Sequence, residues 1–463
     1  MLKLKSIDPV NGRLLPSIIL YCLPLMLGSF IQVLFNAADM AVLGNVCRGD
    51  NGVAVASVGA TSPVVGLIVN VAIGLSGGTN VILARAIGAG DKDRTHKVVD
   101  TSMIIALALG VITLAVGLLV SPALLRVTNC PEECFAGADT YLKIYFSAMP
   151  FVMIYNFGSA VIRVEGDSNR PLIYMAVSGG VNILLNLILC MILPNKVAAV
   201  AIATLVSQGI GAVMVLYRLF TMNGPCRVRP RQLVFDMRSF VSVMRMGIPC
   251  AINSSLYNIA NLQIQSAMNS FGPAAIAGNS SATQAEMVTG SVASSFSTAS
   301  LAFVGQNIGA DNKQRVRSSI FWCCFLSFST AQVIGLGIFA FGRQFLAIFL
   351  PGDTLAIEYG MMRMLCVLAI YGIGTLNSTI SSIVQAFGNT AMPMYTGLVT
   401  VLGFRLLWMN FIYPYLPFSG DGPRDIFFLF VCFSISWILS LAANSVTFSV
   451  MYSRYKRGKV KEL

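Results

Sequence analysis

The chain has 463 residues, of which 56% are hydrophobic and only 11% are charged, and its net charge is +12. This composition excludes an ordinary water-soluble protein, in which about 25% of residues are charged, and it predicts a protein that uses a lipid bilayer as its solvent. The Lys and Arg residues lie mainly in short connectors between apolar segments, which is typical of membrane topology signals and not of a nucleic-acid surface.

Twelve apolar segments follow one another along the chain, each long enough for the roughly 20 residues that a membrane-crossing helix needs. In chain order they are residues 14–44, 53–84, 98–120, 138–162, 172–193, 198–220, 240–268, 274–304, 318–341, 359–387, 394–415 and 426–452. The connectors on the side of the two termini carry 23 Lys and Arg residues, against seven on the other side. We therefore expect a multi-pass protein of the inner cell membrane with both termini in the cytoplasm.

The two halves of the chain repeat each other. Three pairs of segments match at nearly one offset: 24–36 with 249–261, 88–94 with 309–315, and 163–171 with 385–393. Each half holds six spans, an even number, so the halves share one orientation and are expected to be related by a pseudo-two-fold axis along the membrane normal.

The predicted fold class is an all-α integral membrane protein with twelve transmembrane helices in two six-helix bundles. The predicted domains are an amino-terminal lobe at 1–220, a cytoplasmic connector at 221–239, and a carboxy-terminal lobe with a basic tail at 240–463. Cys130 and Cys134 lie in a connector that is expected on the outer side of the membrane. The sequence is compatible there with a disulfide between them and with two free thiols.

Oxygen-bearing side chains in the first half predict a cation site. Asp39 lies about 8 Å below the outer end of its span at 1.5 Å per residue, and Asn36 is one turn deeper. Asn182, Asn186 and Thr204 fall at compatible depths. Sodium prefers oxygen ligands of this kind, whereas a proton needs only the carboxylate. The alternatives are an aspartate that simply reaches water and asparagines that only join helices.

The second half has a different set of polar residues, because Ile264 occupies the place of Asp39. Glu286 and Arg405 each lie midway along a span, where a charge costs about 2.5–3.5 kcal/mol. We predict either a structural pair between these two residues or a Glu286 that faces a cavity and attracts a cationic substrate. Four adaptable apolar side chains are further candidates for a cavity wall, with ordinary core as the alternative: Tyr155, Tyr257, Met153 and Met287.

The motifs that carry the repeat also resemble those of the multidrug and toxic compound extrusion (MATE) family. This resemblance covers essentially the whole chain. The resemblance rests on Pro24 with Asn36, Asp39 and Gly44, on the sequence GAGDK at 88–92, on Arg163 with Gly166, Asp167 and Pro171, and on GQNIGA at 305–310. It implies an antiporter that exports small organic, often cationic, drug-like solutes by alternating access while sodium or protons re-enter.

The resemblance also implies that Asp39, Asn182, Asn186 and Thr204 match the cation site of the family. Asn186 stands where such transporters can carry a second aspartate, so the choice between Na⁺ and H⁺ stays open.

Several activities are disfavoured by what the sequence lacks. It has no Gly-x-x-x-x-Gly-Lys-Ser/Thr motif for ATP, and its only histidine, His96, lies in a connector, so no zinc site is predicted. We expect a monomeric transporter and not an enzyme, with no cofactor beyond the coupling ion and no nucleic-acid partner. A flippase for a lipid-linked glycan or other amphiphile is the first alternative, and a membrane receptor or channel is the second.

Overall fold

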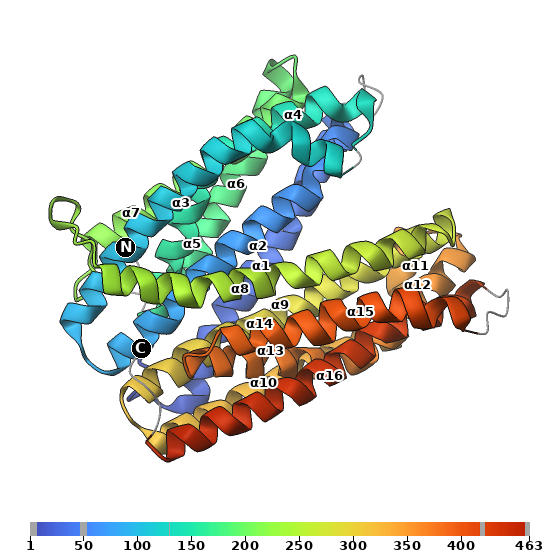
Figure 1. The fold of residues 1–463 in the computed structure, drawn as a ribbon. Helices are drawn as coiled ribbons and strands as arrows, with labels where there is room; N and C mark the ends of the chain where they lie inside the picture. Colours follow the sequence, from blue (N-terminus) through green and yellow to red (C-terminus); the bar gives the residue numbers. More distant parts are fainter. Residues whose placement is uncertain (1–6, 47–52, 129, 417–421, 459–463) are drawn as a thin grey trace. The chain divides into compact units, whose positions relative to one another are not determined.

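The computed structural model describes residues 7–46, 53–128, 130–416 and 422–458. All regular structure within these ranges is helical (Figure 1). The helices are α1 (Leu14–Val46), α2 (Val53–Gly88), α3 (Lys92–Val127), α4 (Glu132–Ser147), α5 (Met149–Val164), α6 (Asn169–Ile192), α7 (Lys196–Thr221), η1 (Pro230–Gln232), α8 (Met237–Asn269), α9 (Pro273–Gly309), α10 (Lys313–Ala340), α11 (Gly342–Phe349), α12 (Thr354–Val367), η2 (Leu368–Ile370), α13 (Tyr371–Ala386), α14 (Ala391–Gly397), η3 (Leu398–Gly403), α15 (Phe404–Leu407), η4 (Trp408–Ile412), η5 (Tyr413–Tyr415) and α16 (Gly422–Lys456).

The helices confirm the predicted all-α membrane fold. Among the described residues, ten helical segments are long and apolar enough to cross a membrane, and α4 with α5 makes an eleventh as a bent pair. With 33 residues, α8 is the twelfth helix of spanning length.

Three predicted spans are interrupted in the structure, since 359–387 comprises α12, η2 and α13, and 394–415 comprises α14, η3, α15, η4 and η5. The segment expected as one span at 138–162 is formed by two helices. The first, α4, begins at Glu132, and it meets α5 at an angle of 47°. Pro150 lies at the start of α5 and has no backbone N–H to continue the α4 hydrogen-bond ladder. Cys130 and Cys134, before and within α4, are free thiols.

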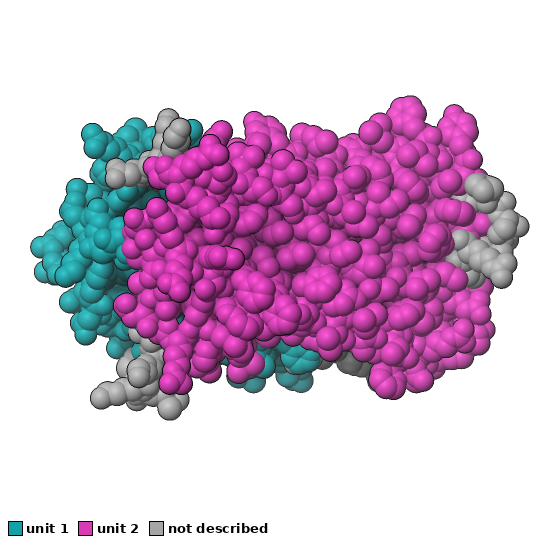
Figure 2. Space-filling model, turned by 90° about the horizontal axis from the view of Figure 1, so that it is seen from below, with its two compact units in different colours: residues 1–8, 27–251 teal, residues 9–26, 252–463 magenta. Residues whose placement is uncertain are grey.

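The chain forms two compact units, which Figure 2 distinguishes by colour. Unit 1 comprises residues 1–8 and 27–251, and unit 2 comprises residues 9–26 and 252–463. The boundaries thus fall within α1 and α8, and the connector expected to separate two lobes belongs to unit 1. There, the backbone N–H of Val234 donates to Asp100 Oδ2 of α3 at 3.2 Å, and that of Asp236 donates to Thr101 Oγ1 at 3.1 Å.

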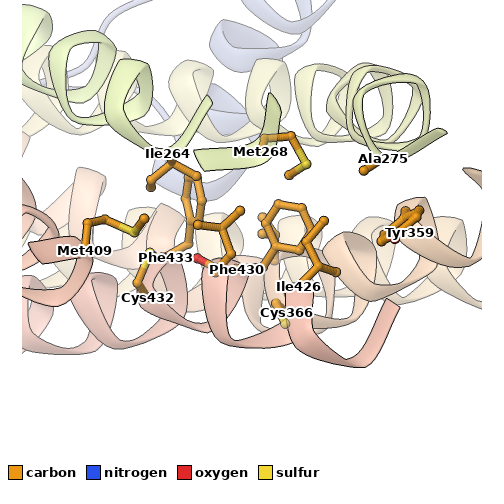
Figure 3. Packing of buried hydrophobic residues seen from close by; sticks show 12 residues of the cluster. Ile264, Met268, Ala275, Tyr359, Cys366, Met409, Ile426, Phe430, Cys432 and Phe433 are labelled. Atoms are coloured by element: carbon orange, nitrogen blue, oxygen red, sulfur yellow. Dashed lines mark hydrogen bonds between the residues drawn. The ribbon is translucent and has the colours of Figure 1, made fainter. Parts of the chain in front are cut away.

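Each unit is a bundle held by close helix contacts. In unit 1, α5 packs against α2, α3 and α7, and α6 lies along α7. In unit 2, α9 packs against α10, α12 and α13, and α16 packs against α12 and α13. Figure 3 shows part of the core of unit 2, where Phe430 and Phe433 of α16 point toward Ile264 and Met268 of α8.

The repeated turns have the same backbone conformation in both halves. Gly90 has φ +70°, and Asp311, at the matching place in the second half, is the positive-φ non-glycine residue of the described chain, at +49°. The next residue caps the following helix in each case. Asp91 accepts from the N–H of Arg94 at 2.9 Å, and Asn312 accepts from that of Arg315 at 3.0 Å. The sequence repeat is therefore also a structural repeat.

Candidate functional site

Three polar side chains of unit 1 meet between α6 and α7. Asn186 Nδ2 donates to Asn182 Oδ1 at 3.3 Å, and Asn182 Nδ2 donates to Thr204 Oγ1 at 3.5 Å. The Thr204 hydroxyl in turn donates to the backbone oxygen of Val200 at 3.0 Å. Asn186 is fully buried and Asn182 is 7% exposed. This cluster offers neutral amide and hydroxyl oxygens, which are suitable ligands for a hard cation.

Local sequence signals place these side chains. Asn182 and Asn186 are four residues apart on α6 and so share one helix face. Asn195 caps α7 by accepting from the N–H of Ala198 at 3.0 Å. Lys196 Nζ donates to the terminal carbonyl oxygens of α6, on Cys190 at 2.7 Å and on Leu193 at 3.0 Å. These hydrogen bonds in the short turn fix the position of α7 along α6. Thr204 consequently lies opposite Asn182.

A second, charged cluster lies inside unit 2. Arg363 of α12 makes a two-point ion pair with Glu286 of α9, through Nε to Oε1 at 2.5 Å and Nη2 to Oε2 at 2.8 Å. Its Nη1 donates to Asn279 Oδ1, also on α9. Arg363 is only 8% exposed, so the pair is largely removed from solvent. A two-point pair of this geometry is stronger than a single charged hydrogen bond.

Arg405 forms the other part of the charged cluster. It is 1% exposed, and all of its hydrogen bonds go to neutral oxygens. Nη1 donates to Asn261 Oδ1 at 2.8 Å, while Nε and Nη2 both donate to Ser436 Oγ at 3.2 Å. Its guanidinium carbon lies 4.2 Å from the centre of the Phe433 ring, and that of Arg363 lies 5.2 Å from the same centre. Phe433 thus contacts two cations.

A cavity of about 170 Å³ opens beside this cluster, within unit 2. Its lining comes from α8, α9, α12 and α16: Asn261, Ile264, Gln265, Met268, Asn279, Thr283, Arg363 and Phe433. The wall combines an arginine and polar amides with the apolar side chains of Ile264, Met268 and Phe433.

Comparison with known proteins decides the family. The MatE family model matches residues 24–188 and 249–409, which is most of both halves of the chain. The chain belongs to the MATE family. Its members are membrane transporters and not enzymes, as the sequence motifs predict.

Individual proteins and a solved structure resemble the chain over most of its length. It is 25% identical over 460 residues to YpnP of Bacillus subtilis, a probable multidrug resistance protein, and covers 99% of each sequence. It is 27% identical to the probable multidrug resistance protein NorM of Thermotoga maritima, over 83% of this chain and 82% of that protein. A crystal structure of a MATE protein in its bent conformation superposes with a TM-score of 0.84 at 23% identity, over 99% and 100% of the two chains.

The MATE fold brings together three of the five side chains predicted for the cation site, namely Asn182, Asn186 and Thr204. Asn36 and Asp39 are on α1, but their side chains lie outside the described part of the structure. Within the described ranges, no three His, Cys, Asp or Glu side chains are grouped as a metal site would require.

The five residues predicted for a substrate cavity fall in both units. In unit 1, Met153 is 2% exposed, and the Tyr155 hydroxyl donates to Pro171 O at 3.1 Å. In unit 2, the Tyr257 hydroxyl accepts from Asn377 Nδ2 at 3.5 Å, and Met287 is 47% exposed. None of the five lines the cavity of unit 2. Met153 is too deeply buried to form a wall in this conformation.

The predicted pair between Glu286 and Arg405 is wrong, because Glu286 pairs with Arg363. Arg363 lies only four residues into the span predicted to begin at 359, which would put it near a helix end. In the structure, α12 begins at Thr354, and Arg363 lies more than two turns inside it. Because the arginine neutralises its carboxylate, Glu286 is a weak attractor for a cationic substrate.

Proposed function

We propose that this MATE protein is a cation-coupled antiporter that exports small drug-like organic solutes, organic cations among them, by alternating access. The observation that carries the proposal is the convergence of Asn182, Asn186 and Thr204 in unit 1. Together with the carboxylate of Asp39, these side chains would supply the oxygen ligands of a coupling-ion site. The multidrug resistance proteins YpnP and NorM, similar in sequence, support drug-like substrates.

The coupling ion would act through the charge of Asp39. A carboxylate in the membrane is costly when bare, so binding of Na⁺ or H⁺ removes most of that cost. The neutral oxygens of the asparagine cluster would add ligands for Na⁺. An ion shifts a conformational equilibrium only by its difference in affinity for the two states. We therefore propose that the ion binds more tightly in the outward-open state and that the solute is released from that state.

The test is gradient-driven uptake of ethidium into proteoliposomes. Either an imposed proton gradient or an imposed sodium gradient is expected to drive uptake by the unmodified protein, and Asp39→Asn is expected to abolish it. Asp93→Asn, which changes an exposed acid on α3, is the matched control and is expected to retain uptake.

Two results would reject the proposal. Uptake that persists in Asp39→Asn would remove this residue from coupling. No gradient-driven uptake by correctly inserted protein would move the assignment to a flippase for a lipid-linked amphiphile.

We further propose that the protein works as a monomer in the inner membrane with both termini in the cytoplasm. The expected result is that an epitope at either terminus is cleaved by protease only in inverted vesicles. Cleavage of a terminal epitope in right-side-out vesicles would reverse the orientation.

A further inference from the structure

The charged cluster beside the cavity of unit 2 holds two arginines, Arg363 and Arg405, and one acid, Glu286. Glu286 compensates the charge of Arg363 in this cluster. Arg405 has only Asn261 and Ser436 as hydrogen-bond partners, both of them neutral, and the face of Phe433. A buried charge without an opposite charge is strongly destabilising in an apolar environment. A bound anion would supply the missing negative charge.

The arginines beside the cavity act only as hydrogen-bond donors, and this fixes how the neighbouring amides are oriented. A guanidinium only donates, so Asn279 must turn its oxygen to Arg363, and its Nδ2 then donates to Gln265 Oε1 at 3.2 Å. Asn261 likewise turns its oxygen to Arg405. The side-chain oxygens of Asn279 and Asn261 thus accept from arginines, and Asn261 has its side-chain N–H groups to offer a ligand. Such a lining favours a ligand rich in lone pairs.

Two lining residues define how a ligand would be held. Three of the five N–H groups of Arg363 are used, by Glu286 and Asn279, which leaves two for a ligand. The Thr283 hydroxyl donates to the backbone oxygen of Asn279 at 2.8 Å, so only its lone pairs remain. Arg405 does not line the cavity, but it polarises Asn261, which does. The cavity therefore presents two cationic groups, one directly and one through an amide.

We propose that this cavity binds the carboxylate end of an organic solute. The carboxylate would accept from Arg363 and Asn261, while its hydrocarbon part would contact Ile264, Met268 and Phe433. A cavity of about 170 Å³ is smaller than the ~300–1,000 Å³ of drug-sized sites. It therefore takes a benzoate-sized group and not a whole drug. The inference deepens the proposed function, on which it rests for the export of such solutes, but binding itself is independent of transport.

The experiment compares two dyes that differ only at the carboxyl group. Rhodamine B carries a free benzoate, and its ethyl ester has the same cationic ring system without the negative charge. Fluorescence anisotropy titrations use the full-length protein in detergent, and binding is counted only where excess benzoate displaces it. The acid is expected to bind about tenfold more tightly than the ester. Equal affinities, or tighter binding of the ester, would overturn the proposal.

Substitutions separate a ligand site from a merely structural cluster. Asn261→Asp places a carboxylate against Arg405 and should remove the preference for the acid, with thermal stability kept or raised. Arg405→Gln should remove the same preference if it folds. Arg457→Gln, which removes an exposed positive charge after α16, is the control and should keep it. A folded Asn261→Asp protein that still prefers the acid would overturn the proposal.

The carboxylate site and the antiport proposal can be rejected separately, because the dye measurement needs no gradient and no transport. Absence of the acid preference, with ethidium uptake intact, rejects the carboxylate site alone. A clear acid preference, with no gradient-driven ethidium uptake, supports the site and rejects antiport.

Discussion

The polar interiors of the two units differ in charge although their backbones repeat. Unit 1 brings together neutral side chains, Asn182, Asn186 and Thr204, whereas unit 2 holds Glu286 with two arginines. The repeated turns before α3 and α10 nevertheless share a left-handed residue and a side-chain cap. Backbone geometry at helix ends has thus been kept after duplication, while a few interior side chains have diverged.

The divergence is sharpest at two repeated positions on α1 and α8. Asn36 matches Asn261, and Asp39 matches Ile264. Both second-half residues line the cavity of unit 2. The place of a predicted cation site in one half is therefore a cavity bordered by an arginine in the other. We infer that the two halves select opposite charges.

Removing the acid of the charged cluster, Glu286, is expected to have the largest effect on stability. Glu286→Gln leaves Arg363 buried without its opposite charge, which should destabilise the protein by about 3–5 kcal/mol. Thermal unfolding in detergent measures the loss. Glu358→Gln, at an exposed acid on α12, should have little effect. The double variant Glu286→Gln/Arg363→Gln should lose less than the single one, and an equal loss would contradict the pair.

A substitution that widens the spacing between α9 and α12 beside the charged cluster is expected to have the next largest effect on stability. A Cβ on Gly278 of α9 would meet the backbone of α12 at Ala356 O, and Gly360 N would be only 2.9 Å away. Gly278→Ala should push the helices apart at a cost of about 1–3 kcal/mol and weaken the preference for rhodamine B. Gly337→Ala on α10, with no atom within 4 Å, is the control. Unchanged stability and preference in Gly278→Ala would show that the cluster tolerates this displacement.

The oxygen cluster of unit 1 predicts a smaller effect on ion affinity. Thr204→Val removes one hydroxyl at nearly constant volume, so the half-saturating concentration of Na⁺ for transport should rise about three- to tenfold, or about 1 kcal/mol. Thr221→Val removes a hydroxyl with the same kind of intrahelical bond at the end of α7 and should change nothing. An unchanged half-saturation in Thr204→Val would favour a proton carried by Asp39 alone.

A pH dependence of stability is expected from an acid of unit 1 that has no partner like that of Glu286. Burial raises the pKa of Glu165, in the connector after α5, from 4.5 to about 7, with Arg218 partly opposing the shift. The folded protein therefore holds this proton more tightly than the unfolded chain. The resulting stability is full below pH 4.5 and is lost as the pH rises through about 7.

The measurement is the unfolding temperature in detergent, expected to be a few degrees lower at pH 8 than at pH 5.5. Glu165→Gln should flatten this difference, and Glu133→Gln, at an exposed acid, should not. A pH dependence that survives in Glu165→Gln would assign it to another group.

Local geometry explains which parts of the sites were predictable. Asn182, Asn186 and Thr204 could be grouped because helix periodicity sets two of them on one face and a short turn sets the depth of the third. The partner of Glu286 could not be found in this way, since it lies 77 residues further along the chain. Depth from the predicted span starts gave no signal either, because Glu286 is 12 residues from 274 and Arg363 only four from 359, a difference of about 12 Å. Only from the helix starts in the structure, Pro273 and Thr354, do the two residues lie within about one turn of each other in depth.

The ion pair of unit 2 also has a consequence for biosynthesis. Glu286 precedes its partner by 77 residues, which corresponds to about 4–15 s at a synthesis rate of roughly 5–20 residues per second. Throughout that interval α9 has its acid in the membrane while Arg363 has not yet been made, and such a charge costs about 2.5–3.5 kcal/mol. The carboxylate of Glu286 therefore gains its opposite charge only after α12 has been made, so that part of the stability of α9 in the membrane depends on a helix that is synthesised later.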